Sequence, residues 1–165
     1  ARAAPIAALT AFLARIGIPF AEAPLPGPTF LPGVEIRGGV VHFDRTRLVH
    51  PGDLLHEAGH VALCPPDRRA QIHGNVAASV PELAGTELGV ILWSYAACLA
   101  ADVPLDVVLH AGGYAGDAAW LRESFERGTY IGLPLLVWMG LCEDPAKARA
   151  EGREGFPHMT RWLRA

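Results

Sequence analysis

The sequence predicts a single domain of α+β class, dominated by helices, with one small antiparallel sheet early in the chain. Three observations lead to this expectation. Hydrophobic residues make up 51% of the 165 residues and charged residues 19%, which excludes a disordered chain and provides for a core. Apolar residues recur at helical spacing along most of the sequence. Short runs rich in β-branched residues lie near the N-terminal end, around a Gly-Gly pair.

The N-terminal part is expected to hold one helix, one connection and one hairpin. A helix is predicted over residues 5–16, where apolar side chains recur every three to four positions. The stretch 19–32 is rich in proline and predicts an extended surface connection. Two β-rich runs flank Arg37-Gly38-Gly39, which predicts a hairpin over 34–43.

The remaining elements are expected to be helices separated by turns. Residues 51–63 read as a helix that ends before Pro65-Pro66, and residues 67–78 read as a loop. Ser79 and Glu82 have the spacing of a capping box, which predicts a long helix over about 80–101. Shorter helices are predicted over 104–110, 117–127, 134–141, 145–151 and 157–163. The four tryptophans are expected to pack in the core: Trp93, Trp120, Trp138 and Trp162.

Composition narrows the class of partner. The formal net charge of −3 gives no electrostatic basis for nucleic acid or an anionic membrane as the main partner. The longest apolar runs, 88–101 and 130–141, are shorter than the roughly 20 residues of a membrane span, so no span is expected. Three scattered cysteines argue against a disulfide framework and for the cytoplasm. The high mean hydropathy of +0.24 indicates a buried helical core and leaves open an apolar surface that forms a homo-oligomer.

The sequence His56-Glu57-Ala58-Gly59-His60 carries the clearest chemical signal. Residues four apart lie on one face of a helix, so both imidazoles can reach one Zn²⁺ ion. Glu57 lies about one hundred degrees around the helix, where it can take a proton from a water near the metal. The alternative is two core histidines satisfied by polar neighbours, but the apolar flanks of the motif bury this helix and favour a metal site.

The motif resembles the signature of the zincin metallopeptidases. The order of hairpin, motif helix, loop and acid-bearing helix is similar to the gluzincin branch and, loosely, to compact ImmA/IrrE-type peptidase domains. The resemblance covers roughly residues 34–101. The later Glu-Ala-Asn-type helix of those compact domains is replaced here by Glu87-Leu88-Gly89, and the third histidine of the metzincins is absent. The resemblance implies a peptidase whose third zinc ligand is a glutamate on the helix after the motif.

Catalytic zinc is usually held by three protein ligands, so a third ligand is expected. Glu87 is favoured because its predicted helix carries an apolar stripe on which an unpaired carboxylate is costly. Glu82 is assigned to the capping box instead. The alternative for Glu87 is an ion pair with Arg68 or Arg69. The full set of candidates is Cys64, His73, Glu82, Glu87, Asp102 and His110.

His110 and Tyr114 are candidates for a donor that stabilises a tetrahedral oxyanion. They flank Gly112-Gly113 on a stretch that could border the cleft. The alternative is a helix-end histidine and a turn tyrosine. His42, His50, His73 and His158 are expected on the surface or in loops.

The motif therefore predicts a zinc-dependent hydrolase, with His56, His60 and Glu87 on the metal and Glu57 as general base. The expected substrate is a peptide or protein, aligned by backbone pairing on the strand 40–43. Two other functions are compatible with the sequence: a metal-binding sensor or interaction domain without turnover, and a helical protein in which the motif is accidental.

Overall fold

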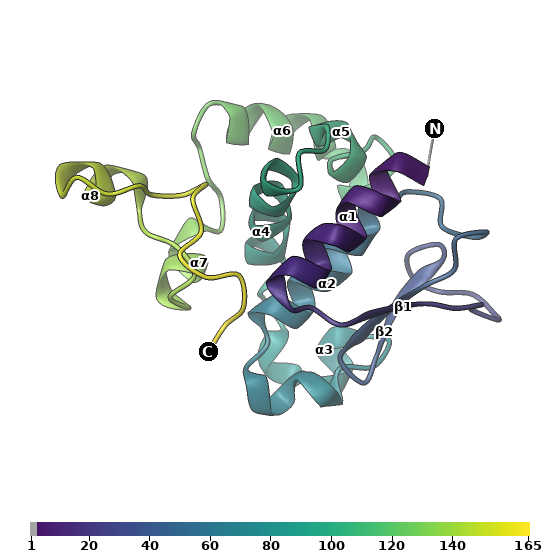
Figure 1. Ribbon diagram of the computed structural model, residues 1–165. Coiled ribbons are helices and arrows are strands. Elements are labelled where there is room, and N and C mark those ends of the chain that lie inside the picture. The colour runs from purple at the N-terminus through teal and green to yellow at the C-terminus, as the bar shows by residue number, and fades with distance from the viewer. Residues whose placement is uncertain (1–2) are drawn as a thin grey trace.

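The computed structural model describes residues 3–165 and confirms the predicted α+β class (Figure 1). The described helices and strands follow one another in this order: α1 Ala3–Ile16, β1 Phe20–Glu22, β2 Val34–Arg37, β3 Val40–Phe43, α2 Asp53–Leu63, η1 Pro66–Gln71, α3 Val76–Ser79, η2 Pro81–Leu83, α4 Glu87–Ala100, α5 Leu105–Val108, η3 Tyr114–Gly116, α6 Ala118–Glu126, α7 Leu133–Trp138 and α8 Pro145–Ala150. Those labelled η are short 3₁₀ helices.

Helix α2, which carries the motif, lies at the centre of the fold. It packs most extensively against α4 and also contacts α1, α5 and the strands β2 and β3. Figure 1 shows α1 crossing in front of α2, with the sheet to one side and α4 to the other. The motif helix is therefore held on several sides, which fixes the direction of its side chains.

The sheet is mixed rather than purely antiparallel, which corrects the prediction. The hairpin of β2 and β3 forms as expected, with Val34 opposite Phe43. Strand β1, however, lies within the stretch predicted to be an extended surface connection, and it pairs in parallel with β3. The strand order is β1-β3-β2, so β3 is central and β2 is an outer strand.

The predicted start of the long helix at residue 80 is wrong, because α4 begins at Glu87. Gly85 adopts a left-handed conformation with φ of +83°, which separates η2 from α4. The expected capping box is absent. Ser79 donates its hydroxyl hydrogen bond to backbone carbonyls of the preceding turn, and Glu82 forms an ion pair with Arg68 at 2.5 Å. The predicted loop 67–78 contains most of η1 and most of α3.

Residues from the N-terminal and C-terminal segments of the chain pack together in the core. Trp93 of α4 is fully buried, and its Nε1 donates to the carbonyl of Trp162 at 3.0 Å. The ring of Phe12 meets Trp162 edge-on, with centroids 4.9 Å apart. The predicted helix over 157–163 does not form, because Thr160 donates its backbone N–H to Leu141 instead. Trp120 and Trp138 are 55% and 71% exposed, so the core positions predicted for them are wrong.

Within residues 3–165, no helix combines the length and the apolar character that crossing a membrane requires.

Candidate metal centre

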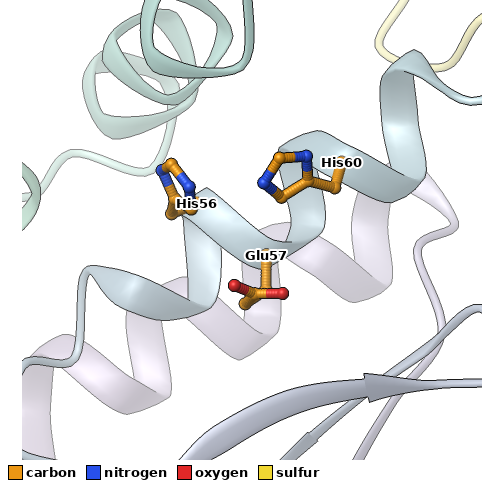
Figure 2. Close-up of side chains that lie close together, drawn as sticks. All are labelled: His56, Glu57 and His60. Atoms are coloured by element: carbon orange, nitrogen blue, oxygen red, sulfur yellow. The ribbon is translucent and has the colours of Figure 1, made fainter. Parts of the chain in front are cut away.

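Helix α2 presents its polar residues on one face and its apolar residues to the core. Leu54, Leu55 and Val61 are among its buried side chains, and the helix ends at Leu63, with Cys64 as its C-cap before Pro65. His56, Glu57 and His60 each offer a ligand atom, and these atoms lie within 4.8 Å of one another. Figure 2 shows the three side chains on adjacent turns of the same helix. The spacing in the sequence thus produces the predicted cluster.

Glu87 completes the group from the first turn of α4. Its Oε1 lies 3.0 Å from Nε2 of His56, and its Oε2 lies 3.5 Å from Nε2 of His60. Among the six candidates for a third ligand, it is the one that contacts both imidazoles in the described chain. The carboxylate is not buried on an apolar stripe, as the sequence suggested, because its side chain is 55% exposed.

Gly59 explains how α4 comes close enough to supply this carboxylate. A Cβ on Gly59 would lie 2.9 Å from Cγ1 of Val90 and 3.3 Å from Cε3 of Trp93, both on α4. These distances are shorter than van der Waals contact, so a larger residue would force the two helices apart. The small residues inside the motif therefore have the packing role that the sequence suggested.

Replacing Gly59 with alanine is expected to destabilise the fold by about 1–3 kcal/mol, the usual cost of overpacking a core. Helix propensity alone would predict the opposite sign, because alanine is a better helix former than glycine by about 1 kcal/mol. Urea unfolding followed by circular dichroism measures the change. An unchanged or increased free energy of unfolding would contradict the close packing of α4 on α2.

Burial dominates the electrostatics of the cluster. Loss of solvation raises the pKa of Glu57 to about 7, aided by the charges of Glu87 and Asp53 and opposed by His56. Burial lowers the pKa of His60 to about 4, and the charge of His56 acts in the same direction. His60 is therefore neutral near pH 7 and keeps a nitrogen lone pair free for a metal.

His56 and Glu87 behave as a coupled pair. Burial alone lowers the pKa of His56, but the hydrogen bond that its Nε2 donates to Glu87 and the charges of the nearby carboxylates outweigh burial, so the net pKa is raised. Burial would raise the pKa of Glu87, but its contacts with the two histidines produce a net decrease. Glu87 is thus held ionised, the form in which a carboxylate binds a cation.

Two nitrogens and one carboxylate oxygen are a donor set that suits zinc in catalytic sites. The Nε2 atoms of both histidines converge on the same carboxylate, 3.0 Å and 3.5 Å from the two oxygens of Glu87. The residues present therefore fit a zinc ion, which His56, His60 and Glu87 would hold.

A cavity of about 560 Å³ opens beside the cluster. His56, Glu57, His60 and Glu87 contribute to its wall, together with Val34 and Glu35 of β2. Most of the remaining wall is apolar, and Phe30 on its rim is fully exposed. Among residues 3–165, no lysine or arginine belongs to the lining, and its other members are Pro28, Thr29, Leu31, Gly74, Asn75, Val76, Ala77, Leu83, Ala84 and Gly85.

The two predicted oxyanion donors lie next to one another, with the ring centroids of His110 and Tyr114 6.4 Å apart. Tyr114 lies beside His56, with ring centroids 6.0 Å apart. His110 lies farther along, where its Nε2 is 3.0 Å from Oδ1 of Asp53. Neither side chain is among the residues that line the cavity. Burial, aided by the charges of Asp53 and Glu87, raises the pKa of Tyr114, so its hydroxyl stays protonated and able to donate.

Two neighbours of the site were missed from the sequence. Asp53 precedes His56 by three residues and thus shares its helix face, a spacing that could have identified it. His50, expected on the surface or in a loop, stacks on His110 with centroids 3.6 Å apart. The partner of His50 lies more than fifty residues away in the sequence, so the local sequence around His50 does not reveal this contact. Cys64 is buried at the end of α2, where burial raises its pKa, and does not line the cavity.

Comparisons of this chain with protein-family models, with curated proteins and with solved structures find no match.

Proposed function

We propose that this protein is a zinc-dependent hydrolase that cleaves peptide bonds. The observation that carries the proposal is the convergence of Nε2 of His56, Nε2 of His60 and the carboxylate of Glu87, with Glu57 beside them at the wall of a cavity. Zinc bound by these three side chains would supply Lewis acidity toward water and toward a substrate carbonyl.

Glu57 is the proposed general base. Its pKa of about 7 is well matched to proton transfer near neutral pH, because such a carboxylate both accepts and returns a proton readily. In the proposed reaction, a Glu57 oxygen takes a proton from the water that attacks the peptide carbonyl. The same oxygen then delivers that proton to the leaving amine as the C–N bond breaks. Tyr114, whose hydroxyl stays protonated, is the proposed donor to the developing oxyanion.

The outer strand β2 is the proposed guide for an extended peptide. The sequence suggested strand 40–43 for this role, but β3 is paired on both sides and has no open edge. β2 is paired with β3 on one side, its other edge has isolated bridges to Leu31 at Val34 and to His73 at Arg37, and between these Glu35 lines the cavity together with Val34. A peptide that adds to β2 would therefore run beside the metal ligands.

A peptide library read by mass spectrometry tests the proposed activity. Zinc-loaded protein is expected to cleave a subset of peptides, and a chelator is expected to abolish cleavage. Cleavage that persists with chelator would indicate a different hydrolase or a contaminant. Zinc binding without cleavage of any peptide would overturn the hydrolase proposal in favour of a non-catalytic metal-binding domain.

A further inference from the structure

A cluster of four side chains lies beside the candidate metal centre: Tyr114, which contacts His56, and three residues that the chemistry described above does not use, Asp53, His110 and His50. Asp53 and His110 form a buried pair, with side chains 7% and 11% exposed. His50 lies just before α2, and Tyr114 lies four residues after His110. The cluster thus joins the N-terminal end of the motif helix to the turn that carries Tyr114.

The ring of His110 is closely surrounded by His50 and by the backbone of Gly112 and Gly113. The imidazole of His50 stacks on it with an interplanar angle of 8°. Gly112 and Gly113 come close to the two rings: a Cβ on Gly113 would lie 3.0 Å from Cε1 of His110, and one on Gly112 would lie 3.1 Å from Nε2 of His50. Because Nε2 faces Asp53, it carries the proton, and Nδ1 is buried without a partner in the described chain. His110 is therefore directed toward Asp53, and it does not line the cavity.

The turn that follows is strained. Tyr114 and Ala115 adopt left-handed conformations, with φ of 57° and 52°, which residues with a Cβ rarely adopt. Two such residues in succession persist only when surrounding contacts hold them. The contacts at the start of the turn include those of His110 with Asp53 and His50, the close approach of the two glycines, and the hydrogen bond that Gly113 N–H donates to the carbonyl of His110.

We infer that Asp53, His110 and His50 are positioning residues that hold the turn 112–116 in place and keep the Tyr114 ring against His56, beside the metal. This inference rests on the proposed metal centre for its function, but the geometry of the turn can be tested without it. His110 is then not the oxyanion donor that the sequence suggested, and acts through Tyr114.

Fluorine NMR of protein labelled with 3-fluorotyrosine tests this inference, because the chain has three tyrosines, Tyr95, Tyr114 and Tyr130. A Tyr114→Phe variant assigns the resonance. In metal-free protein, His110→Ala and Asp53→Ala should move or broaden the Tyr114 signal and leave the other two in place. Asp53→Asn, which keeps an acceptor for His110, should largely retain the signal of the unmodified protein. His158→Ala is the control, since this exposed histidine lies elsewhere.

Cobalt(II) added to the same samples extends the test to the metal. The Tyr114 signal should then show the largest paramagnetic shift of the three, and His110→Ala should reduce it. If His110→Ala does not fold, all three signals collapse together and Asp53→Ala replaces it. A Tyr114 signal unchanged in the folded variants would overturn the inference, as would bound cobalt that leaves Tyr114 unshifted. Failure to bind cobalt, with the metal-free effect intact, would remove the proposed metal function and leave the positioning role supported.

Discussion

Glu57→Gln is expected to retain zinc and thermal stability while lowering turnover by a factor on the order of 10²–10⁴. Glutamine has nearly the same shape but cannot accept the proton of the attacking water. Glu57 is also buried, and loss of solvation raises its pKa, so replacing it with a neutral side chain removes a group that is costly to ionise. The melting temperature should therefore stay the same or rise.

Three measurements on this variant separate the possible roles of Glu57. Zinc content comes from elemental analysis, stability from thermal unfolding, and turnover from the peptide identified in the library. Loss of zinc in this variant would indicate that Glu57 binds the metal or holds one of its ligands in place, and its assignment as general base would be wrong. Full activity with zinc retained would exclude Glu57 as the base.

Glu87→Ala is expected to weaken zinc binding by more than about 100-fold, beyond the 10–100-fold typical for a residue that only supports a ligand. The reason is geometric, since this carboxylate faces Nε2 of both histidines at 3.0 and 3.5 Å. Glu82→Ala is the matched control, because Glu82 is a nearby glutamate that pairs with Arg68 on the surface. That exposed pair contributes little to stability.

Chelator competition measures both affinities on the same scale. The expected ranking has Glu87→Ala far weaker than the unmodified protein and Glu82→Ala close to it. The opposite ranking would mean that the carboxylate of η2, rather than that of α4, completes the site.

The sequence predicted the cluster of His56, Glu57 and His60 well, because the cluster depends only on the spacing of side chains along one helix. His56 and His60 lie one helical turn apart, and the helix that carries them follows from its apolar flanks and from Pro65. Glu87, the favoured candidate for a third ligand, does contact both histidines, although the reason given from the sequence was partly wrong. Glu87 is half exposed at the start of α4, and the close approach of Gly59 to Val90 brings it to the histidines.

The predictions from sequence fail where contacts between segments distant in the sequence determine the structure. Strand β1 forms because β3 offers it a parallel partner, which no local pattern in a proline-rich stretch reveals. The start of α4 depends on the left-handed Gly85, although Ser79 and Glu82 have ideal spacing for a cap. Trp138 is exposed and has the guanidinium of Arg164 above its ring at 5.1 Å, a contact with the C-terminal segment that helical periodicity does not encode.

Zinc content tests the central claim most directly. Protein purified without chelator, or reconstituted with zinc and freed of excess, is expected to hold about one zinc per chain by elemental analysis, as a three-ligand site requires. His56→Ala and His60→Ala should each lose most of that zinc, whereas His158→Ala should retain it. Negligible zinc in all four proteins, or equal zinc in all four, would contradict a metal centre built on His56 and His60.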